Sequence, residues 1–288
     1  MIKSATGLKA NVRNISKGDD KVAKALIRIF FMERFLERVS MSEYRDQFIL
    51  KGGMLVSSLL GINVRATMDI DTTVRALPLT EQDISRIVSE ICAIEIEDRV
   101  SFQITYAETI MEDFDYPGIR LHMIGTLERL RQPIKIDVST DDVITPRAIE
   151  YQYKLMFEER TILLNTYNIE TLLAEKAQTI ISRGLANTRM RDFYDLYEIT
   201  GSKEFSWSIA SDAFKATCRK RKTEFSNERI EDELKNITGS KELETLWNNF
   251  RKKNYFVGEI EYQDIIRQVS DAIRKIAVLL ISDKTQIL

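Results

Sequence analysis

Two stretches, Phe48-Ile-Leu-Lys-Gly52-Gly53 and Thr67-Met-Asp69-Ile-Asp71-Thr-Thr-Val74, decide the fold of the first half of this 288-residue chain. The second alternates apolar with polar residues, a period of two that predicts a β-strand over residues 67–74. Side chains at positions i and i+2 of a strand share a face, so both aspartates are expected to project together, roughly 6 to 7 Å apart. The glycine pair is expected at the entrance of a short buried helix.

Around these stretches the pattern of apolar residues predicts both helices and strands. Helical spacing over Asp20–Val39 and Leu79–Ile94 predicts two amphipathic helices. Three later segments have strand character: Val100–Ala107, Gly118–Ile124 and Pro133–Ser139. From Ile169 onward the pattern is almost entirely helical, with helices expected over Leu172–Ser182, Met190–Ile199, Trp207–Arg221 and Tyr262–Ile281.

The change of pattern predicts two domains. All four prolines, Pro78, Pro117, Pro133 and Pro146, lie before residue 147, and the helical region from residue 167 has none. We therefore expect an α+β fold, with a mixed sheet and flanking helices over residues 1–166 and a helical domain over residues 167–288.

The composition excludes several classes of protein. Lys and Arg number 42 against 44 for Asp and Glu, so any contact with nucleic acid must come from a local basic patch. Cys92, Cys218 and His122 are too few soft ligands for a structural zinc site. No signal-peptide core and no membrane-spanning stretch is apparent, which predicts a cytoplasmic protein without membrane contact.

The aspartates predict a metal site. Two carboxylates on one face destabilise each other's charged forms unless a cation compensates, and oxygen ligands favour Mg²⁺ or Mn²⁺. A third acid, Asp137, lies between apolar residues of a short strand and is expected to face away from the core. If this strand lies beside that of Asp69 and Asp71, three carboxylates converge, and such a trio can serve phosphoryl transfer.

The glycine pair points to phosphate. Gly52 and Gly53 at a helix start allow the backbone to approach an anion closely, and the free N–H groups favour negative charge. Lys51 directly precedes the pair and adds a positive charge. The plainer interpretation of these three residues is a glycine turn beside a surface lysine.

These segments, taken together, carry a family resemblance. The chain resembles the nucleotidyltransferase superfamily in Phe48-Ile-Leu-Lys-Gly52-Gly53, Arg65-Ala-Thr-Met-Asp69-Ile-Asp71 and Ile136-Asp137-Val138. More narrowly, it resembles the AbiEii/AbiGii toxins of abortive-infection systems, which are toxin–antitoxin pairs that confer phage resistance, in Leu173-Ala-Glu-Lys176, Ser182-Arg183-Gly184 and Arg191-Asp192-Phe-Tyr-Asp195-Leu-Tyr197.

The resemblance implies a nucleotidyltransferase-like domain followed by a helical domain, an NTP substrate, with GTP as one candidate, and a cognate antitoxin encoded nearby that can act without a stable complex. It implies that Gly52 and Gly53 contact the nucleotide phosphates, with Lys51 beside them. By the same resemblance Asp69, Asp71 and Asp137 bind metal, Asp69 and Asp71 being catalytic, and Lys176 and Asp192 complete the catalytic and nucleotide-binding set.

Three functions remain open at this stage. The first is transfer of a nucleoside monophosphate to an RNA acceptor, expected to be the 3′ end of tRNA, which would stop growth. The second keeps the donor but modifies a protein side chain. The third is a GTP- or ATP-binding module without turnover. A basic cluster, Lys215 and residues 219–222, is either a solvated helix face or an RNA contact.

Overall fold

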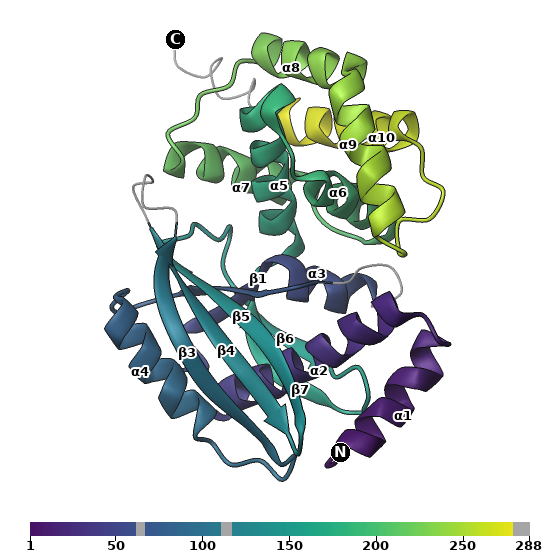
Figure 1. The fold of residues 1–288 in the computed structure, drawn as a ribbon. Coiled ribbons are helices and arrows are strands. Elements are labelled where there is room, and N and C mark those ends of the chain that lie inside the picture. The colour runs from purple at the N-terminus through teal and green to yellow at the C-terminus, as the bar shows by residue number, and fades with distance from the viewer. Residues whose placement is uncertain (62–66, 111–116, 279–288) are drawn as a thin grey trace. The chain divides into compact units, whose positions relative to one another are not determined.

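The structure is a computed structural model that describes residues 1–61, 67–110 and 117–278 (Figure 1). Arg65 and Ala66 of the motif, and residues 279–281 of the last expected helix, lie outside the described residues. The chain divides into two compact units. One comprises residues 1–142 and 149–166, and the other comprises residues 143–148 and 167 onward.

A seven-stranded mixed sheet forms the centre of the first unit. Its order is β3-β4-β5-β2-β1-β7-β6, with β1 Phe48–Lys51, β2 Ile70–Val74, β3 Val100–Ile110, β4 Gly118–Leu127, β5 Leu130–Thr140, β6 Ile149–Lys154 and β7 Thr161–Thr166. Strand β2 runs parallel to β5 and antiparallel to β1, and β4 is antiparallel to both β3 and β5. The sheet thus mixes parallel and antiparallel pairs, as expected of an α+β fold.

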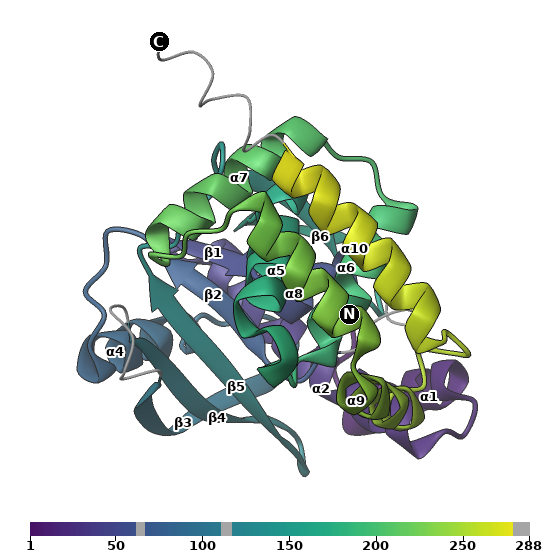
Figure 2. The same cartoon turned by 90° about the horizontal axis from the view of Figure 1, so that it is seen from above.

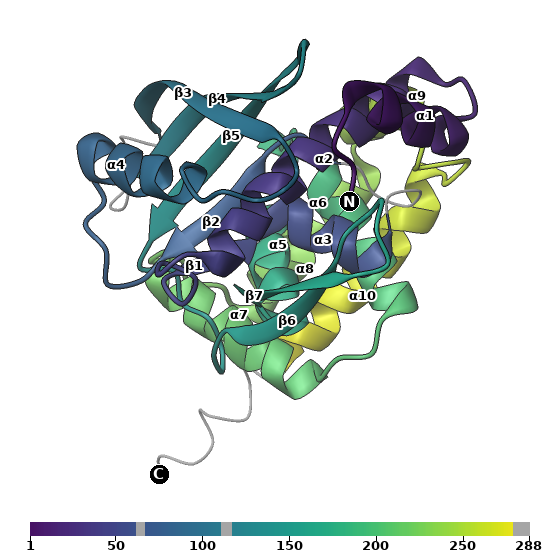
Figure 3. The same ribbon diagram turned by 90° about the horizontal axis from the view of Figure 1, so that it is seen from below.

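The helices of this unit are α1 Ala5–Ser16, α2 Asp20–Met41, α3 Gly52–Leu60 and α4 Glu81–Cys92. Helices α2 and α4 pack against the sheet, α2 on β5 and β7 and α4 on β3 and β4 (Figure 3). The packing of α2 is close: a Cβ on Gly125 of β4 would lie 2.4 Å from the Phe31 ring. Phe35 of α2 meets Phe102 of β3 edge to face at 6.2 Å. One face of strands β3–β5 is therefore buried under helices.

Helix α2 also buries charge, which its amphipathic pattern did not indicate. The Arg38 guanidinium donates to both carboxylate oxygens of Asp98, at 2.9 and 3.0 Å, and to the carbonyl of Val100 at 2.8 Å. Both members of the pair are almost fully buried. The bidentate pair joins α2 to the start of β3. Separating the two side chains would leave a buried charge without a partner, which is costly.

The second unit is helical (Figure 2). It contains α5 Ile169–Arg183, a 3₁₀ turn at Gly184–Ala186, α6 Met190–Ser202, α7 Trp207–Lys220, α8 Asn227–Gly239, α9 Lys241–Lys253 and α10 Tyr262–Val278. Side-chain caps from Asn168, Ser206, Ser226 and Ser240 begin α5, α7, α8 and α9. None of the helices in the described ranges is long and apolar enough to cross a membrane.

The expected strand over residues 67–74 was wrong in its first three residues. Strand β2 begins only at Ile70, where pairing with Ile136 of β5 starts. Pairing with β1 begins at the next residue, because Lys51 is the last residue of β1 and the chain turns into α3 directly after it. Asp69 therefore lies on the bend that leads into β2, and Asp71 lies within the strand.

Candidate active site

Two of the three expected acids lie on neighbouring strands. Asp71 of β2 and Asp137 of β5 are direct partners in the parallel register, so their side chains leave the sheet on the same face. Asp69 lies two residues before Asp71 and is partly exposed. Its charge acts on both Asp71 and Arg120, and it therefore lies in the same electrostatic neighbourhood.

The glycine pair holds Asp71 in place. Gly52 adopts φ +59°, a conformation that side chains other than glycine's rarely take, and it is the first residue of α3. A Cβ at this position would lie 2.1 Å from Oδ2 of Asp71, and the N–H of Gly53 donates to that same oxygen at 3.1 Å. The helix N-terminus thus already favours negative charge at the carboxylate itself.

Lys51, the last residue of β1, is directed to the same sheet face. Its Nζ donates to Oγ of Ser139 at 2.7 Å and forms an ion pair with Asp142. Ser139 in turn donates to Asp142 at 2.8 Å. The lysine therefore lies beside Asp71 within a polar cluster at the end of β5, and its charge lowers the pKa of Asp71.

Arg120 was not predicted from the sequence and is the main partner of Asp137. It is the direct cross-strand neighbour of Asp137 on β4, and its Nε and Nη2 donate to the two carboxylate oxygens at 2.8 and 2.7 Å. This bidentate pair raises the pKa of Arg120. The arrangement holds the Asp137 side chain in one rotamer.

Burial and neighbouring charges both act on the Asp71 carboxyl. Burial raises the pKa of its carboxyl, and the charges of Asp137 and Asp69 raise it further, while the Gly53 N–H and Lys51 lower it. Across residues 1–61, 67–110 and 117–278, no three or more His, Cys, Asp or Glu side chains are gathered closely enough to hold a metal ion. In this arrangement both oxygens of Asp137 are taken by Arg120.

The chemistry of the donors nevertheless fits a hard divalent cation. Carboxylate oxygens are the ligands that Mg²⁺ and Mn²⁺ prefer, and Asp71 and Asp137 lie on adjacent strands with a shared face. A cation would also remove the repulsion that raises the pKa of Asp71. Binding through Asp137 would require Arg120 to give up at least one of its two hydrogen bonds.

In the helical unit, Lys176 and Asp192 form part of one buried ion cluster. Nζ of Lys176 on α5 donates to Asp192 at 3.0 Å and to Asp195 at 2.7 Å, both on α6. Nε of Arg189 lies 2.8 Å from the second oxygen of Asp192. Asp195 is fully buried, and sequence reasoning gave it no role although its i,i+3 spacing from Asp192 places both on one helix face.

The basic cluster near the end of α7 is partly engaged within its own unit. Nη1 of Arg221 donates to Thr179 at 3.0 Å and also to Gln178, and Nη2 lies 3.6 Å from Glu175. Lys215 lies 3.9 Å from Asp212. These contacts give Arg221 a packing role against α5, and its role toward RNA stays a prediction.

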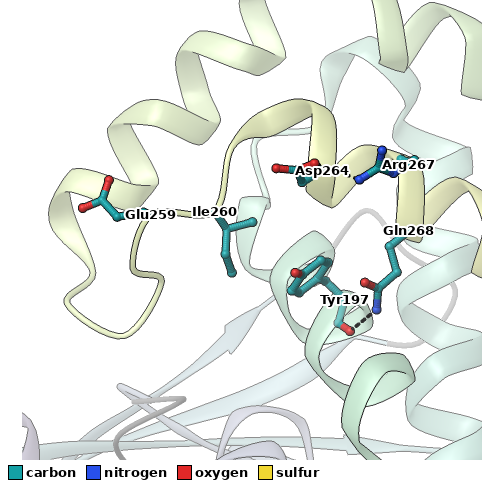
Figure 4. A pocket seen from close by; sticks show the side chains of 6 residues that line it. All are labelled: Tyr197, Glu259, Ile260, Asp264, Arg267 and Gln268. Atoms are coloured by element: carbon teal, nitrogen blue, oxygen red, sulfur yellow. Dashed lines mark hydrogen bonds and ion pairs between the residues drawn. The ribbon is translucent and has the colours of Figure 1, made fainter.

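A cavity of about 430 Å³ opens between α6, α10 and the segment that precedes α10 (Figure 4). Among its lining residues, Gln268 donates to the carbonyl of Tyr197 at 2.7 Å and Arg267 pairs with Asp264 at 2.8 Å. Gln268, Arg267 and Asp264 are thus engaged with groups of the cavity wall itself. It contains none of the residues expected to bind nucleotide.

Comparison with known proteins identifies the family. Residues 34–269 match the family model described as nucleotidyl transferase AbiEii toxin, type IV TA system. The chain belongs to the AbiEii toxin family. The match spans the glycine pair, all three aspartates, Lys176 and Asp192, so this AbiEii chain is a nucleotidyltransferase toxin of a toxin–antitoxin system.

The fold agrees with this assignment. The AbiEii chain superposes on MenT4, a nucleotidyltransferase toxin from Mycobacterium tuberculosis, with a TM-score of 0.59 and 15% identity over 94% of this chain and 98% of that one. It is also similar to JHP933 from Helicobacter pylori, with a TM-score of 0.48 and 13% identity over 92% and 96% of the two chains. No curated protein matches its sequence.

Proposed function

We propose that this AbiEii toxin transfers a nucleoside monophosphate from an NTP to the 3′ end of tRNA, and that this transfer arrests growth. The observation that carries the proposal is the register pair of Asp71 and Asp137, directly beside the glycine pair that opens α3. Carboxylates and a helix N-terminus on one sheet face can serve the two needs of phosphoryl transfer, positioning and charge neutralisation. GTP is the first donor to test.

In this proposal Asp69, Asp71 and Asp137 bind Mg²⁺ or Mn²⁺. The ion would supply charge neutralisation for the triphosphate and the reacting oxygens. Asp71 is held by the Gly53 N–H at 3.1 Å, and its position is therefore fixed before any ligand arrives. Arg120 keeps Asp137 extended toward the same face.

The donor triphosphate would bind on the β1 side of Asp71. Gly52 and Gly53 begin α3 there, and Lys51 adds a cation. Backbone N–H groups and a positive helix end stabilise phosphate oxygens, and a lysine acts as a point charge on them. Lys176 would neutralise part of the triphosphate charge, and Asp192 would orient the nucleotide or accept a proton.

Membership in a type IV toxin family implies a cognate antitoxin. We propose that it is encoded nearby and counteracts the toxin without a stable complex. Co-purification of the two proteins in stoichiometric amounts would contradict this part of the proposal.

The experiment incubates the full chain with each α-³²P-labelled NTP, Mg²⁺ or Mn²⁺, and total RNA, and compares it with two aspartate variants. Asp71→Asn should lose transfer by a factor of about a thousand or more, because the charge stabilisation lost is worth several kcal/mol. Asp46→Asn is the matched control, since the Asp46 side chain is 70% exposed and lies in the turn before β1, where it pairs with Arg45 and not with the site residues. It should label RNA as the parent does.

Each result has a defined meaning. Label in an RNA band of tRNA size, abolished by Asp71→Asn together with growth arrest, supports the proposal. Label in a protein band instead would favour a protein acceptor. Binding of NTP without any labelled product, in a parent that still arrests growth, would favour a module without turnover and would overturn the proposal.

A further inference from the structure

The sheet face that carries Asp137 continues over β4 and β3. Because β5 pairs with β4 and β4 with β3, side chains cross this face in rows. The first row is Asp137, Arg120 and Glu108. The second row, two residues away along each strand, is Lys135, His122 and Tyr106. The rows are roughly 6 to 7 Å apart, and helices α2 and α4 cover the opposite face.

A β-bulge determines the position of Tyr106. The register of β3 with β4 shifts between Ile104 and Tyr106, so the pairing Ile104↔Met123 is followed directly by Tyr106↔His122. Thr105, the extra residue, donates its hydroxyl to the carbonyl of His122 at 2.9 Å. Bulges commonly redirect a side chain, and here the bulge places an aromatic ring on the face of the carboxylates.

Tyr106 and His122 form a stacked pair that is open to solvent. Their ring centroids are 4.0 Å apart and their planes differ by 16°. His122 is held from the side by Glu108, with 2.8 Å between Nε2 and Oε1. Tyr106 is nevertheless 52% exposed, which is unusual for a large aromatic residue within a strand. A rigid stack with an exposed ring can accept one more planar group.

Positive charge lies next to the stack. Lys135 is the cross-strand neighbour of His122 on β5, and Arg131 lies further along the same strand and face, opposite Thr126. Aromatic rings that alternate with Lys and Arg on an open sheet face are typical of surfaces that bind single-stranded nucleic acid, where bases stack and cations contact phosphates.

The order of strands separates the two substrates of the proposed reaction. The sheet order β3-β4-β5-β2-β1 places the glycine pair on the β1 side of the carboxylates and the Tyr106 stack on their β3 side. In-line displacement requires the attacking hydroxyl to approach opposite the leaving pyrophosphate. A donor bound at Gly52 and Gly53 therefore leaves the β4–β3 side for the acceptor.

We propose that the Tyr106–His122 stack, with Lys135 beside it, binds the single-stranded end of the RNA acceptor by stacking one of its bases on Tyr106. The inference rests on the proposed function, because that reaction requires the RNA end to point toward the carboxylates. Binding of RNA to the stack needs no transfer and can be measured by itself. Stacking is tolerant of sequence because every base has a π-face, so the stack positions the end and does not read it.

The test measures RNA binding without chemistry. A fluorescein-labelled single-stranded RNA of about ten nucleotides is titrated, without NTP, into the full chain carrying Asp71→Asn, and anisotropy is recorded. Adding Tyr106→Ala should weaken binding about 10- to 100-fold, whereas Tyr106→Trp should retain it. Lys135→Ala should lower the salt dependence by about 0.7 in slope, and Lys154→Ala, on edge strand β6, should not.

Thermal melting checks that each variant folds, and Tyr106→Trp guards against loss of structure. If Tyr106→Ala binds this RNA as tightly as its parent while the unmutated chain labels RNA, the inference is overturned and the proposed function stands. If Tyr106→Ala weakens binding of a fluorescent NTP and leaves RNA binding unchanged, the stack serves the donor base and the inference is also overturned. Tyr106-dependent RNA binding in a chain that transfers nothing would support the stack and overturn the proposed function.

Discussion

Arg120 offers a quantitative test of whether Asp137 binds metal. It occupies both oxygens of Asp137, and the side chains of the two residues are 30% and 20% exposed, so solvent screens part of their attraction. Hydrogen bonds to a charged group contribute about 1.5–3 kcal/mol when well protected, and with this exposure we assign the pair about 1.4 kcal/mol. A metal ion that takes Asp137 must overcome that amount.

Replacing Arg120 by Gln should therefore tighten Mg²⁺ binding to the nucleotide-free protein about tenfold, since 1.4 kcal/mol corresponds to a factor of about ten. Isothermal titration calorimetry with Mg²⁺ or Mn²⁺ alone measures this. Arg131→Gln is the matched control, because Arg131 lies on the same strand face six residues before Asp137, roughly 20 Å away, and should change nothing. Unchanged or weaker metal binding in Arg120→Gln would refute the reasoning.

Three further variants test other parts of the structure. Burial raises the pKa of Glu33 to about 8, so the folded protein holds a proton that the unfolded chain loses above about pH 4.5. The free energy of unfolding should therefore fall by about 1.4 kcal/mol per pH unit between pH 4.5 and pH 8, and Glu33→Gln should flatten that slope in denaturant titrations. Gly52→Ala forces a Cβ against Asp71 at a positive φ, so it should lower the free energy of unfolding in urea by about 2 kcal/mol and abolish transfer. A variant with the stability of the parent would contradict the contact. Lys176→Met leaves the buried Asp192 and Asp195 without their shared cation and should lower the free energy of unfolding by about 3 kcal/mol. A variant that is as stable as the parent but inactive would instead favour a purely catalytic role for the lysine.

The sequence was sufficient for those elements whose pattern is local. Helix α2 was expected over Asp20–Val39 and spans Asp20–Met41, and α4 was expected over Leu79–Ile94 and begins at Glu81, after the Thr80 cap. The mixed sheet and the helical region were also expected, and the family resemblance is confirmed. Strands β6 and β7 were missed, because their register is set by pairing with each other and with β1.

The partners of the site residues could not be predicted, because they depend on strand order. Nothing near Arg120 in the sequence indicates Asp137, 17 residues away, until β4 and β5 pair in register. The exposed position of Tyr106 depends on a bulge, and alternation along β3 without it would turn the ring to the other face. Helix α1 was missed because few of its residues are apolar; only Leu8, Val12 and Ser16 are buried.

The charge around the carboxylates leads to a last prediction, in which one substitution has opposite effects in two buffers. Burial raises the pKa of the Asp71 carboxyl, and the negative charges of Asp137 and Asp69 raise it further. Without a divalent ion, this negative charge opposes a triphosphate, and removing one unit of it in Asp71→Asn should strengthen NTP binding in EDTA by about 1.4 kcal/mol, or tenfold. With Mg²⁺ present, the same variant has lost a ligand and should bind NTP more weakly than the parent. Fluorescent-NTP titrations in both buffers measure the two signs. If Asp71→Asn changes affinity in the same direction in EDTA and in Mg²⁺, the carboxylate acts on the nucleotide by a route other than a shared cation.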